Sequence, residues 1–148
     1  MKKRVAISSC LLGNNCKYNG NNNLDSELLN KIKDYEIVPF CPEDYAFGTP
    51  RETMDLVLID NEIEAISTEN HTNLSQPIKD YAKEFFDNNR DIELFIGKDK
   101  SPSCGVNTTK LYNIDKNLIS INNSGLMAKE AIKRGLKAYD ATKFIKKL

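Results

Sequence analysis

Short apolar segments alternate with polar stretches along the chain, and their spacing separates strands from helices. Consecutive apolar residues predict buried strands, and apolar residues three or four positions apart predict helices. The predicted strands cover residues 5–7, 35–40, 92–96 and 136–139, and the predicted helices cover 24–32, 74–86, part of 120–135 and 141–148. Segments 55–59 and 62–66 flank Asp60-Asn61 and predict a hairpin. The expected helix N-caps are Asp25 or Ser26 in the first helix and Asn123 or Ser124 in the helix within 120–135.

Strands that alternate with helices favour crossover connections and a mainly parallel sheet. We therefore expect a single α/β domain over residues 1–148, a Rossmann-like three-layer arrangement with a mainly parallel sheet and a small hairpin. Ligands of such sheets bind beyond the carboxyl ends of the strands. Cys10, Cys41 and Cys104 follow the first, second and third predicted strands of the sheet, so they are expected to meet at one edge of it.

The overall charge of the chain is balanced. The 148 residues include 21 Lys and Arg and 21 Asp and Glu, which gives a formal net charge of zero. This balance argues against a dedicated nucleic-acid binder, and we expect no stable nucleic-acid complex. No apolar run approaches the roughly 18 residues that span a bilayer, and the N-terminal segment lacks an A-x-A-type cleavage site. We expect a cytoplasmic monomer with no membrane partner.

The four cysteines are unusual for a cytoplasmic protein, where stable disulfides are rare. They are therefore packing residues, metal ligands or reactive thiols: Cys10, Cys16, Cys41 and Cys104. Structural zinc sites usually contain C-x2–4-C pairs, and the chain has none. Its one histidine, His71, lies in a polar stretch, and no second histidine is available as a partner base for a nucleophilic thiol. Iron–sulfur ligation fits cysteines on separate loops better, as does the Cys41-Pro42 pair.

Four sequence blocks together resemble a known family. The blocks are Ser9-Cys10-Leu11-Leu12-Gly13 with Cys16, Tyr18 and Gly20; Cys41-Pro42-Glu43; Pro50-Arg51; and Ser101-Pro102-Ser103-Cys104-Gly105. Their order and content resemble the iron–sulfur thiouracil desulfidases (thiouracil desulfurases), formerly a family of unknown function. The resemblance covers nearly the whole chain.

The resemblance implies a 4Fe–4S cluster that is held by three cysteines and has one open iron. It also implies a small thiolated pyrimidine as substrate: 4-thiouracil, or its nucleoside or nucleotide, reacts with water to give uracil and hydrogen sulfide without redox chemistry. One of the four cysteines is then surplus. We assign Cys10, Cys41 and Cys104 as ligands because each follows a different strand. Cys16 is the alternative ligand in place of Cys41.

Catalytic roles are assigned to residues in the same blocks. Glu43 stands two residues after Cys41 and is expected to act as general acid and base; the alternative is a surface carboxylate. Ser101 or Ser103 is expected to orient water or to stabilise the developing oxyanion, and the alternative is a serine that caps a turn. Arg51 is expected to pair with Glu43, with a substrate carbonyl or with Glu52.

Substrate contacts are expected from four further residues. Ser9, together with Ser8 and the turn at 14–19, is placed near the pyrimidine edge, and Tyr45 is placed where it can narrow the pocket or stack on the base. Lys98 and Lys100 are candidates for contact with a phosphate, or else are solvated surface lysines.

Two other functions compete with this interpretation. The first is an iron–sulfur protein that transfers sulfur into tRNA or a metabolite; no P-loop or Gly-rich nucleotide motif supports it. The second is a non-catalytic zinc- or RNA-binding module, which the balanced charge and the missing C-x2–4-C pairs disfavour.

Overall fold

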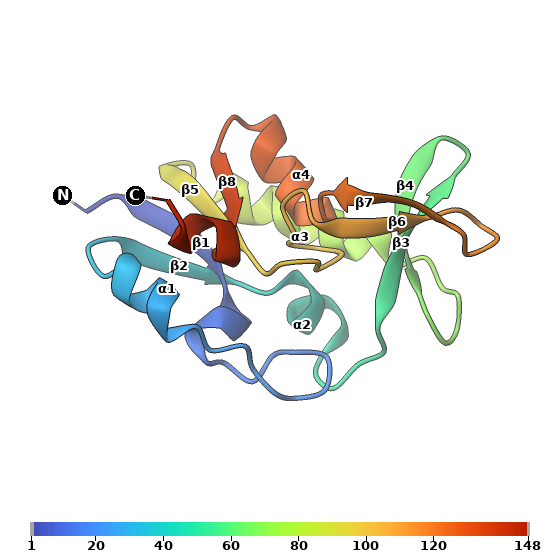
Figure 1. The fold of residues 1–148 in the computed structure, drawn as a ribbon, viewed down its shortest axis with the longest axis horizontal. Coiled ribbons are helices and arrows are strands. Elements are labelled where there is room, and N and C mark those ends of the chain that lie inside the picture. Colours follow the sequence, from blue (N-terminus) through green and yellow to red (C-terminus); the bar gives the residue numbers. More distant parts are fainter. Residues whose placement is uncertain (1, 148) are drawn as a thin grey trace.

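The computed structural model describes residues 2–147, and its centre is a four-stranded parallel sheet. The strand order is β2-β1-β5-β8, and every neighbouring pair is parallel. The prediction of a mainly parallel sheet is confirmed (Figure 1). The strands are β1 (Arg4–Ser8), β2 (Glu36–Phe40), β5 (Ile92–Gly97) and β8 (Lys137–Asp140).

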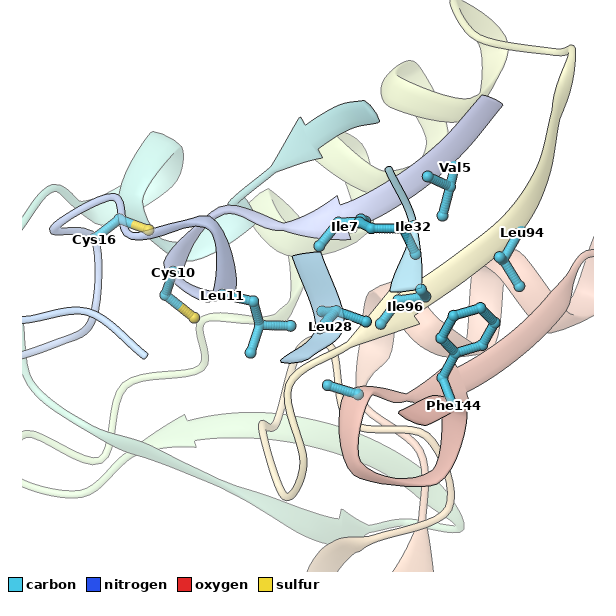
Figure 2. Close-up of a cluster of buried hydrophobic side chains, with 11 residues drawn as sticks. Val5, Ile7, Cys10, Leu11, Cys16, Leu28, Ile32, Leu94, Ile96 and Phe144 are labelled. Atoms are coloured by element: carbon cyan, nitrogen blue, oxygen red, sulfur yellow. The ribbon is translucent and has the colours of Figure 1, made fainter. Parts of the chain in front are cut away.

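Helices cover both faces of this sheet and make the expected three layers. One face packs against α1 (Ser26–Lys31) and α5 (Ala141–Ile145), and the other against α3 (Ser75–Asp87) and α4 (Leu126–Lys133). Alternation along β1 divides its side chains between the two cores, as a strand with a two-residue period requires. Val5 and Ile7 enter the first core, which Figure 2 shows, while Ala6 enters the second.

The predicted helix boundaries are partly confirmed. Asp25 caps α1, and its carboxylate accepts a hydrogen bond from the Leu28 amide at 3.0 Å. The predicted cap of α4 at Asn123 or Ser124 is wrong, because Gly125 is the N-cap and makes no side-chain hydrogen bond. The carbonyl of Ser103 instead accepts the Met127 amide at 2.8 Å. A residue from a distant loop therefore replaces the local cap.

The predicted hairpin belongs to a second sheet, which also has four strands. It comprises β3 (Met54–Ile59) and β4 (Glu62–Ser67), and its turn residues Asp60 and Asn61 have positive φ angles. Two strands were not predicted, β6 (Thr109–Tyr112) and β7 (Leu118–Asn123), and they complete the order β4-β3-β6-β7. β7 is an edge strand, and its apolar side chains are exposed. One face of this sheet packs on α3 and α4, so these helices lie between the two sheets.

Two short helices that follow strands of the parallel sheet were not predicted. A short 3-10 helix, η1 (Ser9–Leu12), follows β1, and α2 (Pro42–Phe47) follows β2. Pro42 occupies the first turn of α2, a position that proline favours, although no helix was predicted there. The predicted last helix extends to Leu148, which lies outside the described residues.

The sheet order places a topological switch point at β1. From β1 the chain crosses to β2 on one side, and β5 lies on the other side. Loops diverge at the carboxyl end of such a strand and leave a crevice between them. Across residues 2–147, the helices are too short or too polar for any of them to cross a membrane.

Candidate active site

A cavity of about 320 Å³ lies at the carboxyl ends of β1, β2 and β5. All four cysteines line it, so the predicted gathering of Cys10, Cys41 and Cys104 at one sheet edge is observed. Glu43, Arg51 and Ser101 also line it, and Lys17, Tyr18, Lys98 and Lys100 contribute to its wall. The cavity therefore combines soft sulfur donors, the carboxylates of Glu43 and Asp99, and several cations.

Cys10 is fixed by η1 and by the Asn-rich loop that follows. Its Sγ lies 3.4 Å from the Ser8 hydroxyl, and the side-chain amide of Asn23 donates to the same sulfur at 3.3 Å. The backbone amide of Asn23 donates to the Cys10 carbonyl at 2.9 Å. The cluster of asparagines thus has a local role, since it folds the loop back onto the thiol.

Cys41 is the N-cap residue of α2. Its amide donates a hydrogen bond to the hydroxyl oxygen of Tyr81 at 3.2 Å, and its Sγ lies 3.9 Å from the carbonyl oxygen of Cys16. Burial raises the pKa of the Cys41 thiol, while a hydrogen bond from the Asp44 backbone opposes the shift. Tyr81, which belongs to α3, therefore fixes the backbone of Cys41 at the start of α2.

Cys104 lies in the long loop between β5 and β6. The Ser101 hydroxyl oxygen accepts the amides of Ser103 and Cys104 at 3.3 and 3.1 Å, which closes a tight turn around the thiol. The buried carboxylate of Asp140 accepts the Val106 amide at 2.7 Å and the Thr108 hydroxyl at 2.6 Å. These contacts fix the loop at both ends, so Cys104 has a defined position without belonging to a regular element.

Glu43 has a partner on each carboxylate oxygen. The hydroxyl of Ser103 donates a short hydrogen bond to Oε2, and Nε of Arg51 lies 3.5 Å from Oε1. Ser103 is fully buried behind Glu43 and does not line the cavity itself. Arg51 pairs with Glu43, as one of the three expected alternatives stated, while Glu52 binds Asn70 and the loop amides beside it.

Cys104 and Cys16 favour their protonated forms. Burial raises the pKa of Cys104 well above its usual value, and the negative charges of Glu43, Cys41 and Cys10 raise it further. Burial and the neighbouring Cys41 raise the pKa of Cys16 to about 12. Several thiolates in one small cavity are stable only beside a group of positive charge. A metal group bound in the cavity would supply such charge and hold the cysteines as thiolates.

The donor set fits an iron–sulfur cluster. Thiolates from separate loops surround a cavity much larger than one ion needs, and each cysteine of a cluster binds its own iron. Within residues 2–147, no three His, Cys, Asp or Glu side chains converge on a single metal-ion position. Cys10, Cys16, Cys41 and Cys104 are the residues that could hold the cluster.

Most of the predicted site residues come together here, and two do not. Cys10, Cys16, Cys41, Cys104, Glu43, Ser101, Lys98 and Lys100 line the cavity, and Ser103 contacts Glu43. Ser9 does not line the cavity, although its neighbour Ser8 does. Tyr45 is 77% exposed on α2 and lies against Tyr81. Sequence reasoning missed Asn23 and Tyr81, because their roles depend on loop closure and on helix packing.

Comparisons with known proteins agree with this geometry. A family profile for 2-thiouracil desulfurase matches residues 5–143. The chain belongs to this family. A solved structure of the [4Fe-4S]-dependent thiouracil desulfidase TudS has the same fold, with a TM-score of 0.74 and 21% identity, over 96% of this chain and 93% of TudS. No curated protein matches the sequence. The predicted resemblance to the thiouracil desulfurases is thereby confirmed.

Proposed function

We propose that this 2-thiouracil desulfurase family member hydrolyses a thiolated pyrimidine and releases hydrogen sulfide. The substrate is 4-thiouracil or its nucleoside or nucleotide. The observation that carries the proposal is the Ser103–Glu43–Arg51 arrangement beside Cys104, which places a supported carboxylate in the same cavity as four thiols. Family membership and the fold of TudS support the same reaction.

Cys10, Cys41 and Cys104 would hold a 4Fe–4S cluster. When bound, the cluster supplies a Lewis-acidic iron that polarises the carbon–sulfur bond of the substrate. Soft sulfur suits iron of a thiolate-ligated cluster, which accounts for selection of a thiocarbonyl over a carbonyl. The protein then has to place a water molecule beside the ring carbon and transfer the two water protons to the leaving sulfur.

Glu43 is assigned to the proton transfers. Its carboxylate takes the two protons of the attacking water in turn and passes each to the leaving sulfur, so that the carbon–oxygen bond replaces the carbon–sulfur bond and hydrogen sulfide leaves. Ser103 and Arg51 hold both carboxylate oxygens and thus aim Glu43 into the cavity. Ser103 is then a positioning residue, since its hydroxyl proton is committed to Glu43.

Ser101 is assigned to the substrate or the attacking water. Its hydroxyl oxygen already accepts two backbone amides, so its own proton is free to donate into the cavity that it lines. Such a donor stabilises the negative charge that develops when water adds to the ring carbon. Lys98 and Lys100 lie on the wall, where they can contact the phosphate of a nucleotide substrate.

An anaerobic assay tests the proposal. Protein reconstituted with iron and sulfide is offered 4-thiouracil, 2-thiouracil and their nucleotides, and hydrosulfide release and cluster content are measured on the same sample. Glu43→Gln is expected to keep the cluster and to lose hydrosulfide release, whereas Glu64→Gln, which lies outside the cavity, is the matched control. A colourless protein with stoichiometric zinc, or full turnover by Glu43→Gln, contradicts the proposal.

A further inference from the structure

Four thiols line a cavity in which the proposed cluster needs three, and Cys16 is the remaining one. This inference rests on the proposed function. Cys16 differs from the other three cysteines because it is the second cysteine after β1, in the loop between η1 and α1. Its residue is only 7% exposed, so the thiol is directed inward and not to solvent.

The backbone on both sides of Cys16 is tied down. Its amide donates to the Asn14 carbonyl at 2.8 Å, and its carbonyl accepts Nη2 of Arg51 at 2.8 Å. The Arg51 amide donates to the Tyr18 carbonyl at 2.9 Å, two residues further along. The loop that carries the thiol is therefore anchored to the same arginine that faces Glu43.

Cys16 lies at the margin of the first core, and it also lines the cavity of the site. Its carbonyl lies 3.9 Å from the Cys41 sulfur, and the charges of Cys41 and Cys10 both act on its thiol. Figure 2 shows Cys10 and Cys16 beyond the carboxyl end of β1, away from the aliphatic side chains around Val5 and Ile96. Packing alone does not require a cysteine to line this cavity beside the Cys41 and Cys10 thiols.

We propose that Cys16 is an exchangeable fourth ligand of the cluster. Without substrate, its thiolate binds the iron that Cys10, Cys41 and Cys104 leave free; the thiolated substrate displaces it. In the exchange, the bond between this iron and the Cys16 sulfur breaks, and a bond between the iron and the substrate sulfur forms. The released thiolate takes a proton from water, and no electron is transferred.

Such a ligand protects the protein between turnovers. An iron with an open coordination position is the one that an oxidant or a chelator removes, which converts a 4Fe–4S cluster into a 3Fe–4S cluster. A thiolate on that iron slows the loss and also competes with substrate. Substitution of Cys16 is therefore expected to make the cluster more fragile and substrate binding tighter.

The test compares the anaerobically reconstituted holoprotein with its Cys16→Ser and Cys16→Ala variants. After timed exposure to air, the electron paramagnetic resonance signal of the 3Fe–4S form is measured. Both variants are expected to retain four irons per chain, to develop this signal several-fold faster and to bind 4-thiouracil several-fold more tightly in visible-absorption titrations. Cys41→Ser is the matched control and is expected to hold fewer than four irons.

Two results overturn the inference. Equal air sensitivity and equal 4-thiouracil affinity in wild type and both Cys16 variants show that Cys16 does not bind the iron. Loss of the cluster from both variants, with circular dichroism unchanged, shows that Cys16 is a permanent ligand. Failure of the wild-type protein to assemble a 4Fe–4S cluster refutes the proposed function as well, so the two failures are distinguished by the wild-type sample.

Discussion

The Nε atom of Arg51 lies 3.5 Å from Oε1 of Glu43, and the two side chains are only 8% and 15% exposed. The other guanidinium nitrogens donate to Thr49 Oγ1, to the Gly48 carbonyl and to the Cys16 carbonyl, at 2.8, 3.1 and 2.8 Å. One side chain thus connects the proposed acid–base residue to the loop that carries the fourth thiol. This connection makes Arg51 a residue on which activity and stability both depend.

Arg51→Gln is expected to lower both the activity and the stability of the protein. Removal of one partner of a buried ion pair leaves an uncompensated charge and costs about 3–5 kcal/mol of the free energy of unfolding. Glu43 also loses its orientation, so kcat for hydrosulfide release falls more than KM changes. Arg51→Lys keeps the charge without the branched donors and is expected to recover only part of kcat. Anaerobic urea unfolding and steady-state kinetics measure these effects.

Arg134→Gln is the matched control for this prediction. Like Arg51, Arg134 forms ion pairs, in its case with Glu130 and Asp87. Its side chain is more exposed and lies away from the cavity. Exposed ion pairs contribute about 0–1 kcal/mol. Equal losses of stability and activity in the Arg51 and Arg134 variants would contradict the role assigned to Arg51.

Ser103→Ala and Ser101→Ala are expected to fail in different ways. Ser103 donates its hydroxyl to Glu43, so its alanine variant keeps the cluster and loses kcat. Ser101 also accepts the Ser103 and Cys104 amides, and its removal leaves buried donors unpaired at about 1–3 kcal/mol each. Its alanine variant is therefore expected to lose cluster content as well as turnover. Iron and sulfide analysis beside the activity assay separates the two, and identical profiles would rule out the distinction.

The sequence was sufficient to predict the parallel sheet, because strands buried on both faces have continuous apolar runs. β1 and β5 are of this kind. β6 and β7 were missed for the opposite reason: β6 has only four residues, and β7 exposes its apolar side chains at a sheet edge. Their identity as strands depends on the pairing of β6 with β3 and of β7 with β6, which no local pattern expresses.

The site residues also divide into those that a local sequence pattern predicts and those whose contacts depend on the folded loops. The strand-end rule brought Cys10, Cys41 and Cys104 together correctly, because it depends only on strand direction. Whether Arg51 binds Glu43 or Glu52 depends on how residues 48–51 turn back toward Tyr18, which the sequence does not specify. Tyr45 was assigned to the pocket from its proximity to Cys41 in the sequence, but α2 directs it outward.

Asp140→Asn is expected to show how the Cys104 loop depends on pH. Burial raises the pKa of Asp140 above its usual value, so the folded state holds this proton more tightly than the unfolded state. Its ionisation therefore lowers the free energy of unfolding as pH rises from about 4 through the raised pKa. Asparagine lacks this titration and accepts only one of the two bonds, from Val106 or Thr108, at a cost of about 1–3 kcal/mol.

The gap in stability between wild type and Asp140→Asn should consequently be largest near the acidic end of this range and should narrow toward neutral pH. Anaerobic urea unfolding at several pH values measures it. A gap that widens as pH rises would mean that the ionised carboxylate stabilises the loop, contrary to the direction of its pKa shift.

Gly125 lets the Cys104 loop lie against the start of α4. A Cβ atom added there would lie closest to the Ser103 carbonyl carbon and 2.6 Å from the Cys104 amide nitrogen, and this peptide backbone cannot move aside as a flexible side chain could. Gly125→Ala is therefore expected to displace Cys104, to cost about 1–3 kcal/mol as overpacked sites do, and to lower the iron content per chain. Gly20→Ala is the control, since nothing lies within 4 Å of an added Cβ and only its φ of +85° opposes alanine, at about 1–2 kcal/mol. Iron and sulfide analysis of the two variants tests whether the close approach at Gly125 positions Cys104. If both variants lose similar stability but only Gly125→Ala loses iron, the close approach positions this ligand. Equal iron content in the two variants would exclude that positioning role.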